Sequence, residues 1–434
     1  MLHPHPLEID VSPSSRATTA PAAGASPAQQ PLTGRILLIL GVVLLGLTLR
    51  HAVTGMAPFL ATIRTDLSMG QGAATLLGML PTLFFGAAGF LAPVLIRRSS
   101  LEVVAFAGMA LAALGTGLRV ATDSVPLFLT LSAVALLGMG FGNVVGAPLV
   151  KKYFPDRQST MLTVFALLMQ AGATIPAMTA MPLAGGDPAA WRTSMLMWAF
   201  ASVVAAVPWL LQIFRARSAE TAAAGSASTQ DSARTFGLAY LLRNPVSLGT
   251  GVFYAVASLI TYAMLAWMPV IIQATAGVDQ PTAAAAYSIF TFMTLPLALI
   301  SPIVGTKMRN ALPYAAALVV LPAVGLLGLV LAPGLFWVWS VLIGLIGGAF
   351  PLAIAHFNTR TRTQEGSGAI AGFAMGIGYL VGTVGPLLGG WLNPATGGWT
   401  VPLVIYAVLA VPMLLAAVAM TKPDRYLEDA AERS

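Results

Sequence analysis

The chain has 434 residues, of which 57% are hydrophobic and 9% are charged, with a net charge of +7 and no cysteine. Soluble domains carry about 25% charged residues, so this composition excludes an ordinary soluble protein. The lack of cysteine excludes disulfides, thiolate metal sites and a cysteine nucleophile, and we expect no metal and no cofactor.

Residues 1–33 are rich in Pro, Ala and Ser without an apolar core, which predicts a disordered tail and no cleavable signal. Twelve apolar segments follow, each long enough to cross a bilayer. Because a backbone in lipid must satisfy its own hydrogen bonds, we expect each segment to be helical. The segments lie at 36–62, 72–96, 101–119, 126–149, 159–183, 191–214, 246–273, 282–306, 312–332, 335–356, 367–392 and 399–420.

The largest polar interruption, at 215–245, falls between the sixth and seventh segments. It predicts two six-helix bundles, at 34–214 and 246–420, joined by a cytoplasmic linker and followed by a tail at 421–434. The side that carries both termini holds 18 basic residues, whereas the opposite side holds only Arg64, Arg119 and Arg192. This asymmetry predicts cytoplasmic termini. It also accounts for the positive charge, so no nucleic-acid partner is expected.

The two halves share a pattern of helix-bending residues in the same order. The matched features are Pro58 with Pro269, Pro93 with Pro302, Pro148 with Pro351, Gly172 to Pro176 with Gly382 to Pro386, and Trp191 with Trp399. Five matches in register indicate a duplicated unit. We therefore predict an all-α membrane protein with twelve transmembrane helices in two pseudo-symmetric six-helix bundles, the architecture of transporters that hold a solute between their halves.

Four stretches resemble the major facilitator superfamily and, within it, the branch of cyanate transporters and nitroimidazole efflux proteins. They are LTLRHAVTGMAPFLATIR ending at Arg64, GMGFGNVVGAPLVKKYFP from Gly138, YAMLAWMPVII from Tyr262 and GYLVGTVGPLLGGWLNPATGGWTVPL from Gly378. The resemblance implies the major facilitator fold, a plasma-membrane location and a cavity lined by spans 1, 4, 7 and 10. One feature departs from the family: the loop after span 2 has Arg97 and Arg98 but lacks the usual acid. The resemblance therefore carries over no cytoplasmic charge relay.

Arg50 lies near the middle of span 1, about 21 Å from each end of the helix. An arginine at this depth costs about 2.5 to 3.5 kcal/mol on insertion scales, so it persists mainly where it faces a cavity or a partner. All 15 acidic residues fall in tails, loops or span edges, which leaves no carboxylate at that depth. We interpret Arg50 as an anion-binding residue. The alternative is a structural role in binding helix carbonyls or polar side chains.

Several other mid-span residues are candidates for the cavity wall. They are Thr54, Asn143, Gln170, Tyr254, Tyr262 and Tyr379. For the polar residues the alternative is hydrogen bonding between helices, and Trp267 fits an interfacial belt. His51 is a candidate for proton coupling because imidazole titrates near neutrality, with a packing role as the alternative.

These residues favour a secondary or facilitative transporter, acting as a monomer on a small anion such as cyanate around Arg50. An exporter of neutral aromatic or heterocyclic compounds is the alternative within transport, with the tyrosines as stacking surfaces. A polytopic enzyme would need a nucleophile with a base or clustered metal ligands, and the four histidines offer little for either. A receptor without flux is the third possibility.

Overall fold

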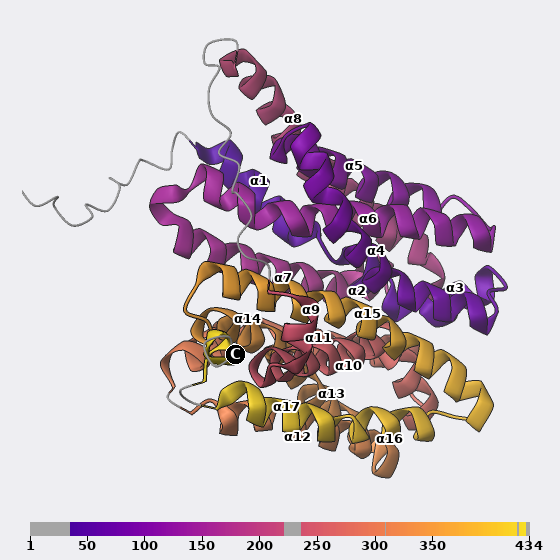
Figure 1. Ribbon diagram of the computed structural model, residues 1–434. Helices are drawn as coiled ribbons and strands as arrows, with labels where there is room; N and C mark the ends of the chain where they lie inside the picture. The colour runs from indigo at the N-terminus through magenta and orange to yellow at the C-terminus, as the bar shows by residue number, and fades with distance from the viewer. Residues whose placement is uncertain (1–34, 221–235, 309, 423–424, 431–434) are drawn as a thin grey trace, which may run out of the picture.

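The computed structural model describes residues 35–220, 236–308, 310–422 and 425–430, so the predicted tail at 1–33 lies outside the described residues. Within the described part, twelve helical spans are long and apolar enough to cross a membrane, which confirms the predicted all-α class and number of spans. In Figure 1 the first six spans, coloured indigo to magenta, lie above the last six, coloured pink to yellow.

The first half contains α1 (Ile36–Thr48), α2 (His51–Thr54), η2 (Ala57–Phe59), α3 (Leu60–Asp66), α4 (Gln71–Arg98), α5 (Leu101–Arg119), α6 (Val125–Tyr153), η3 (Pro155–Arg157), α7 (Gln158–Leu183), η4 (Pro188–Ala190) and α8 (Trp191–Glu220). The second half contains α9 (Leu238–Arg243), α10 (Pro245–Ala276), α11 (Gln280–Lys307), α12 (Leu312–Leu331), η5 (Pro333–Leu335), α13 (Phe336–Gly344), η6 (Leu345–Gly348), α14 (Ala349–Thr359), α15 (Gln364–Thr396), α16 (Thr400–Val408), α17 (Ala410–Thr421) and η7 (Leu427–Ala430). We call the end where α1 begins and α17 ends the terminal face, and the other end the opposite face (Figure 1).

Span 1 is a broken helix, which the sequence analysis did not predict. Regular helix stops at Thr48 and resumes for one turn in α2. Pro58 supplies no backbone N–H to the helix. The hydroxyls of Thr48 and Thr54 donate to the carbonyls of Leu44 (2.8 Å) and Arg50 (3.2 Å), and bonds of this kind bend helices. The break places Arg50 at the N-cap of α2.

The two halves meet near the opposite face. The Gln280 amide donates to the Pro58 carbonyl at 2.8 Å and accepts from the Thr62 hydroxyl at 2.9 Å. Close by, the Gln71 amide donates to the Gly390 carbonyl at 3.1 Å. These bonds join span 1 to span 8 and span 2 to span 11, so they close the bundle at this face.

Towards the terminal face, α4 and α15 diverge. A methyl group placed on Gly78 would lie 3.1 Å from Pro386, and one on Gly86 would lie 3.8 Å from Tyr379. One turn further along α4, a methyl group on Gly89 would find no atom within 4 Å. The two helices are therefore in contact from the opposite face to Gly86, and Gly89 makes no such contact.

The described part of the C-terminal tail is docked on the terminal face. Leu427 is fully buried, its N–H donates to the Arg360 carbonyl at 3.0 Å, and its carbonyl accepts from the Asn244 amide at 2.9 Å. The Glu428 carboxylate accepts from the N–H of Thr363 at 3.2 Å. This segment ties the loop between α14 and α15 to the start of α10.

Candidate functional site

Arg50 lies at the break in span 1 and faces the second half. Its guanidinium lies close enough to the hydroxyls of Tyr262, Tyr379 and Tyr254 for electrostatic interaction. The Nε atom of Arg50 is buried without a hydrogen-bond partner. Four of the predicted binding residues therefore lie close together in the structure, although they come from three different spans.

Two helices of the second half position the three tyrosines. Tyr254 and Tyr262 are eight residues apart on α10, so they project from the same side of that helix. Tyr379 comes from α15, which is the helix most extensively packed against α10. We call Arg50 with these three tyrosines the arginine–tyrosine cluster.

Glycines on α15 make room for the tyrosine rings. A methyl group on Gly378 would overlap the ring of Tyr254, and one on Gly382 would lie 3.4 Å from the ring of Tyr262. The Tyr254 ring also meets Phe350 edge to face, with ring centroids 5.1 Å apart. The Tyr254 ring therefore lies between Gly378 and Phe350.

No carboxylate interacts with the Arg50 guanidinium within the described part of the chain. Two buried acids that the structure describes are paired with basic residues near the terminal face. Glu102 accepts from Lys152 at 2.7 Å, and Asp156 accepts from Arg35 at 2.6 Å. The charge of Arg50 is thus surrounded by phenols rather than by a counter-ion.

Among the described interactions, none joins the remaining predicted binding residues to the side chains of this cluster. The Thr54 hydroxyl is fully buried and donates to the Arg50 carbonyl, so it stabilises the break rather than facing a solute. Both side-chain amide atoms of Asn143 on α6 are buried without a hydrogen-bond partner. Gln170 on α7 is half-buried, one turn before Thr174, which donates to the Thr291 carbonyl of the second half at 3.1 Å.

His51 is buried inside the first half. Its ring stacks on Trp198, with centroids 5.8 Å apart, and its Nδ1 lies 2.9 Å from the Thr48 carbonyl. Its Nε2 lies 3.4 Å from the Thr116 hydroxyl and 3.5 Å from that of Ser202. These partners belong to α1, α5 and α8, so the imidazole points away from the arginine–tyrosine cluster.

The structure corrects one sequence-based placement and shows a burial that the sequence did not indicate. Trp267 was expected in an interfacial belt, but it is fully buried and its indole N–H donates to the Pro386 carbonyl at 3.0 Å. Arg119 ends α5, as the predicted span 101–119 has it, but only 1% of it is exposed, which the sequence did not indicate. Hydropathy marks where a helix ends but does not indicate which side chains the neighbouring helices cover.

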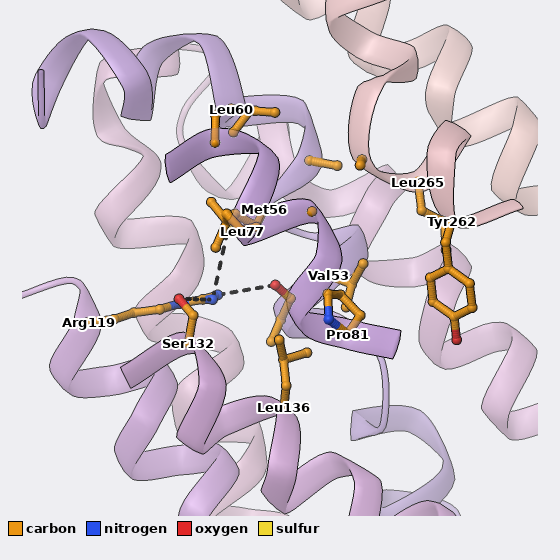
Figure 2. A pocket seen from close by; sticks show the side chains of 15 residues that line it. Val53, Met56, Leu60, Leu77, Pro81, Arg119, Ser132, Leu136, Tyr262 and Leu265 are labelled. Atoms are coloured by element: carbon orange, nitrogen blue, oxygen red, sulfur yellow. Dashed lines mark hydrogen bonds between the residues drawn. The ribbon is translucent and has the colours of Figure 1, made fainter. Parts of the chain in front are cut away.

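A small cavity of about 20 Å³ lies between the halves beside the cluster (Figure 2). Tyr262 lines it from the second half, and Arg119, Ser132, Met56 and Pro81 line it from the first. Arg50 is not part of its wall. A larger hollow of about 660 Å³, at the opposite face of the second half, contains none of the predicted binding residues.

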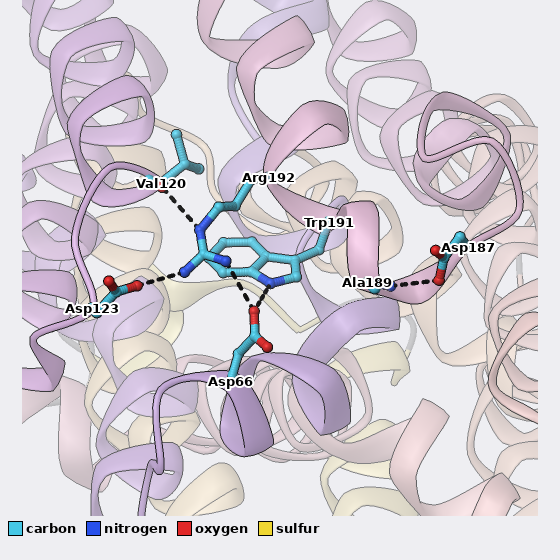
Figure 3. A network of polar contacts seen from close by, with 7 residues as sticks. All are labelled: Asp66, Val120, Asp123, Asp187, Ala189, Trp191 and Arg192. Atoms are coloured by element: carbon cyan, nitrogen blue, oxygen red, sulfur yellow. Dashed lines mark hydrogen bonds and ion pairs between the residues drawn. The ribbon is translucent and has the colours of Figure 1, made fainter.

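Figure 3 shows a polar network that fastens the first half at the opposite face. The Arg192 guanidinium donates to Asp66 at 2.9 Å, to Asp123 at 2.7 Å and to the Val120 carbonyl at 3.1 Å. The Trp191 indole donates to Asp66 at 2.9 Å. The network joins spans 1, 3 and 6, and both of its acids, Asp66 and Asp123, are paired with Arg192.

Twelve spans in two halves, closed at one face and with the partly buried Arg50 between them, are the architecture of a transporter of small solutes. The chain belongs to the Major Facilitator Superfamily, whose profile matches residues 36–359. The curated relatives it resembles are transporters, in agreement with this assignment.

Three relatives are similar over most of their length. The uncharacterized transporter YycB of Bacillus subtilis is 28% identical, over 90% of this chain and 94% of the relative. The 2-nitroimidazole transporter of Escherichia coli is 30% identical, over 88% of this chain and 94% of its own. The cyanate transport protein CynX of Escherichia coli is 26% identical, over 82% of this chain and 90% of its own.

Among solved structures, a bacterial homolog of the human lysosomal transporter Spinster, in an inward-facing and occupied conformation, superposes with a TM-score of 0.65. It covers 90% of this chain and 95% of its own, at 13% sequence identity. At that identity the likeness supports the fold alone.

Proposed function

We propose that the chain transports a small anion, such as cyanate, that binds at the arginine–tyrosine cluster. The observation that carries the proposal is the Arg50 guanidinium, which is met by three phenols and by no carboxylate among the described residues. A buried charge without a partner is costly, so an anionic solute that supplies the countercharge gains binding free energy. The guanidinium and the phenol hydroxyls are donors that suit an anion of a few atoms.

The arrangement of the halves supports alternating access as the mechanism. Bonds such as that between Gln280 and Pro58 close the opposite face, while α4 and α15 diverge towards the terminal face. In the proposed binding site, Arg50 belongs to the first half and the three tyrosines belong to the second. A bound anion would therefore contact both halves, and its binding free energy would depend on how they are arranged.

We place the protein in the plasma membrane as a monomer with cytoplasmic termini. The basis is the excess of basic residues on the terminal side and the bacterial origin of the relatives. In that orientation the bonds that close the opposite face lie on the outer side of the membrane. For coupling, the packing of His51 favours a structural role, with uniport of the anion as the simplest mechanism.

The alternative is transport of a neutral aromatic or heterocyclic solute. Three tyrosine rings around one guanidinium provide stacking surfaces as well as donors. The similarity to the 2-nitroimidazole transporter supports this alternative. Transport of an anion should require the positive charge of Arg50, whereas transport of a neutral solute should not.

Flux into reconstituted vesicles separates them. Labelled cyanate and labelled 2-nitroimidazole are compared in the wild type, Arg50→Ala and Tyr379→Ala. Anion transport predicts cyanate uptake that is lost in Arg50→Ala. Equal cyanate uptake by wild type and Arg50→Ala would reject the proposal. Uptake of 2-nitroimidazole alone, lowered by Tyr379→Ala and insensitive to Arg50→Ala, would establish the alternative.

A further inference from the structure

Arg119 is a second buried guanidinium, and its bonds to the protein are weak. Its Nη1 donates to the Ser132 hydroxyl at 3.3 Å and its Nη2 donates to the Ala52 carbonyl at 3.4 Å, while the Met56 sulfur lies 3.8 Å from Nη1. Charge-assisted hydrogen bonds are usually about 2.7 to 2.9 Å long. The Nε atom is buried without a partner. Arg119 therefore keeps donor capacity that the protein does not use.

The acids closest to this end of α5 do not neutralise Arg119. Asp123 is four residues away in sequence, but its side chain is 87% exposed and it pairs with Arg192. Asp66 pairs with Arg192 as well (Figure 3). Within the described part of the chain, no carboxylate forms an ion pair with Arg119. An anion would therefore gain binding free energy at Arg119 by supplying the missing countercharge, as at Arg50.

The cavity of Figure 2 connects this second cation to the arginine–tyrosine cluster. Arg119 and Ser132 lie at one end of the cavity and Tyr262 lies at the other. Tyr262 also interacts electrostatically with Arg50. Most of the remaining wall is aliphatic, including Leu77 and Leu136. The cavity therefore has Arg119 and Ser132 of the first half at one end and Tyr262 of the second half at the other.

We propose that Arg119 forms a second anion site, which the transported anion occupies between the opposite face and Arg50. This inference rests on the proposed function and adds a path to it. The cavity has room for about one water, so the site holds no solute in the closed arrangement. It takes a monovalent anion of three or four heavy atoms once the bonds of Gln280 and Gln71 across the opposite face are released. The anion then moves from the donors of Arg119 to the hydroxyl of Tyr262 and on to Arg50.

The first test measures cyanate flux in vesicles of both orientations for the wild type, Arg119→Gln, Arg119→Lys and Ser132→Ala. We expect Arg119→Gln to raise the KM for cyanate supplied at the opposite face by about tenfold, the value of one charge-assisted hydrogen bond. The KM for cyanate supplied at the terminal face stays within about twofold of the wild type. Arg119→Lys gives a smaller rise, and Ser132→Ala, which keeps the guanidinium, gives none.

A second test needs no change at Arg119. Because the chain has no cysteine, Met56→Cys beside Arg119 gives a single reactive thiol. We expect a negatively charged methanethiosulfonate reagent, applied at the opposite face, to react faster than a positively charged one of similar size. Cyanate slows the reaction, and adding Arg119→Gln removes the preference.

The outcomes separate the two proposals. If the wild type shows no cyanate flux, the proposed function fails. If the wild type transports cyanate and Arg50→Ala does not, but Arg119→Gln matches the wild type at both faces, only the second site is overturned. An equal rise in KM at both faces, or equal reaction of the two reagents with Met56→Cys, also overturns it.

Discussion

Substitution of Gly378 by alanine tests whether the tyrosine rings are held as the structure has them. The added methyl group would overlap Cδ1 of Tyr254 and lie 2.6 Å from its Cε1. Carbon atoms in contact are about 3.5 to 4.0 Å apart, so the ring must move by about 1 Å. Phe350 limits that movement, since its ring centroid is 5.1 Å from that of Tyr254.

The cost of this displacement is estimated from overpacked cores. Inserting a methylene into a packed site costs about 1 to 3 kcal/mol. If the Tyr254 hydroxyl also loses one hydrogen bond to the solute, worth about 0.5 to 1.5 kcal/mol, the Kd rises by about 2- to 13-fold. The matched control is Gly376→Ala on the same helix, because a methyl group there meets no atom within 4 Å.

Thermal unfolding of the purified protein and cyanate titration measure the two effects. We expect Gly378→Ala to melt at a lower temperature and bind more weakly than Gly376→Ala. Adding Tyr254→Ala to Gly378→Ala removes most of the stability difference, because the overlapping ring is gone. If Gly378→Ala and Gly376→Ala melted and bound alike, the position assigned to the Tyr254 ring would be wrong.

Three further predictions concern the closed face, the docked tail and His51. Gly390→Ala places a methyl group against Thr75, 2.7 Å from its Cβ, so a cysteine probe at the opposite face should become more reactive; unchanged reactivity would contradict the closure described here. Leu427→Ala should cost about 2 to 5 kcal/mol of stability, whereas Leu238→Ala, at a residue 65% exposed, should cost little, and equal melting temperatures would contradict the docking. His51→Asn should lower the melting temperature but leave the pH dependence of cyanate uptake unchanged; a lost pH dependence would assign His51 to proton coupling.

The sequence was sufficient to predict the spans and much of the cluster. Lipid restricts the chain to helices of fixed minimum length, so hydropathy alone predicts twelve spans, and the structure contains them. Arg50 was predictable because a mid-membrane cation is costly and rare. Tyr254 and Tyr262 were expected on one cavity-lining span, and the structure brings both to Arg50.

Features that depend on contacts between distant segments were not predictable. Arg119 ends its helix in sequence, and only the pairing of Asp66 and Asp123 with Arg192 reveals that it is left without a carboxylate. The break after Thr48 had signals in Gly55 and Pro58, but many spans of this chain contain such residues. Leu427 is buried against a loop some 65 residues earlier in the chain, and a hydropathy pattern does not predict contacts between such distant segments.

The most direct test of the account is the Kd of cyanate for the purified wild type, Arg50→Gln and Arg97→Gln. Both variants lose one positive charge, but Arg97 is exposed near the terminal face. A charge-assisted hydrogen bond is worth about 1.5 to 3 kcal/mol, so Arg50→Gln should weaken binding by about 10- to 150-fold. Arg97→Gln should change the Kd less than about twofold. If Arg50→Gln bound cyanate as tightly as the wild type and Arg97→Gln, the anion would not be held by Arg50, and the central claim would be contradicted.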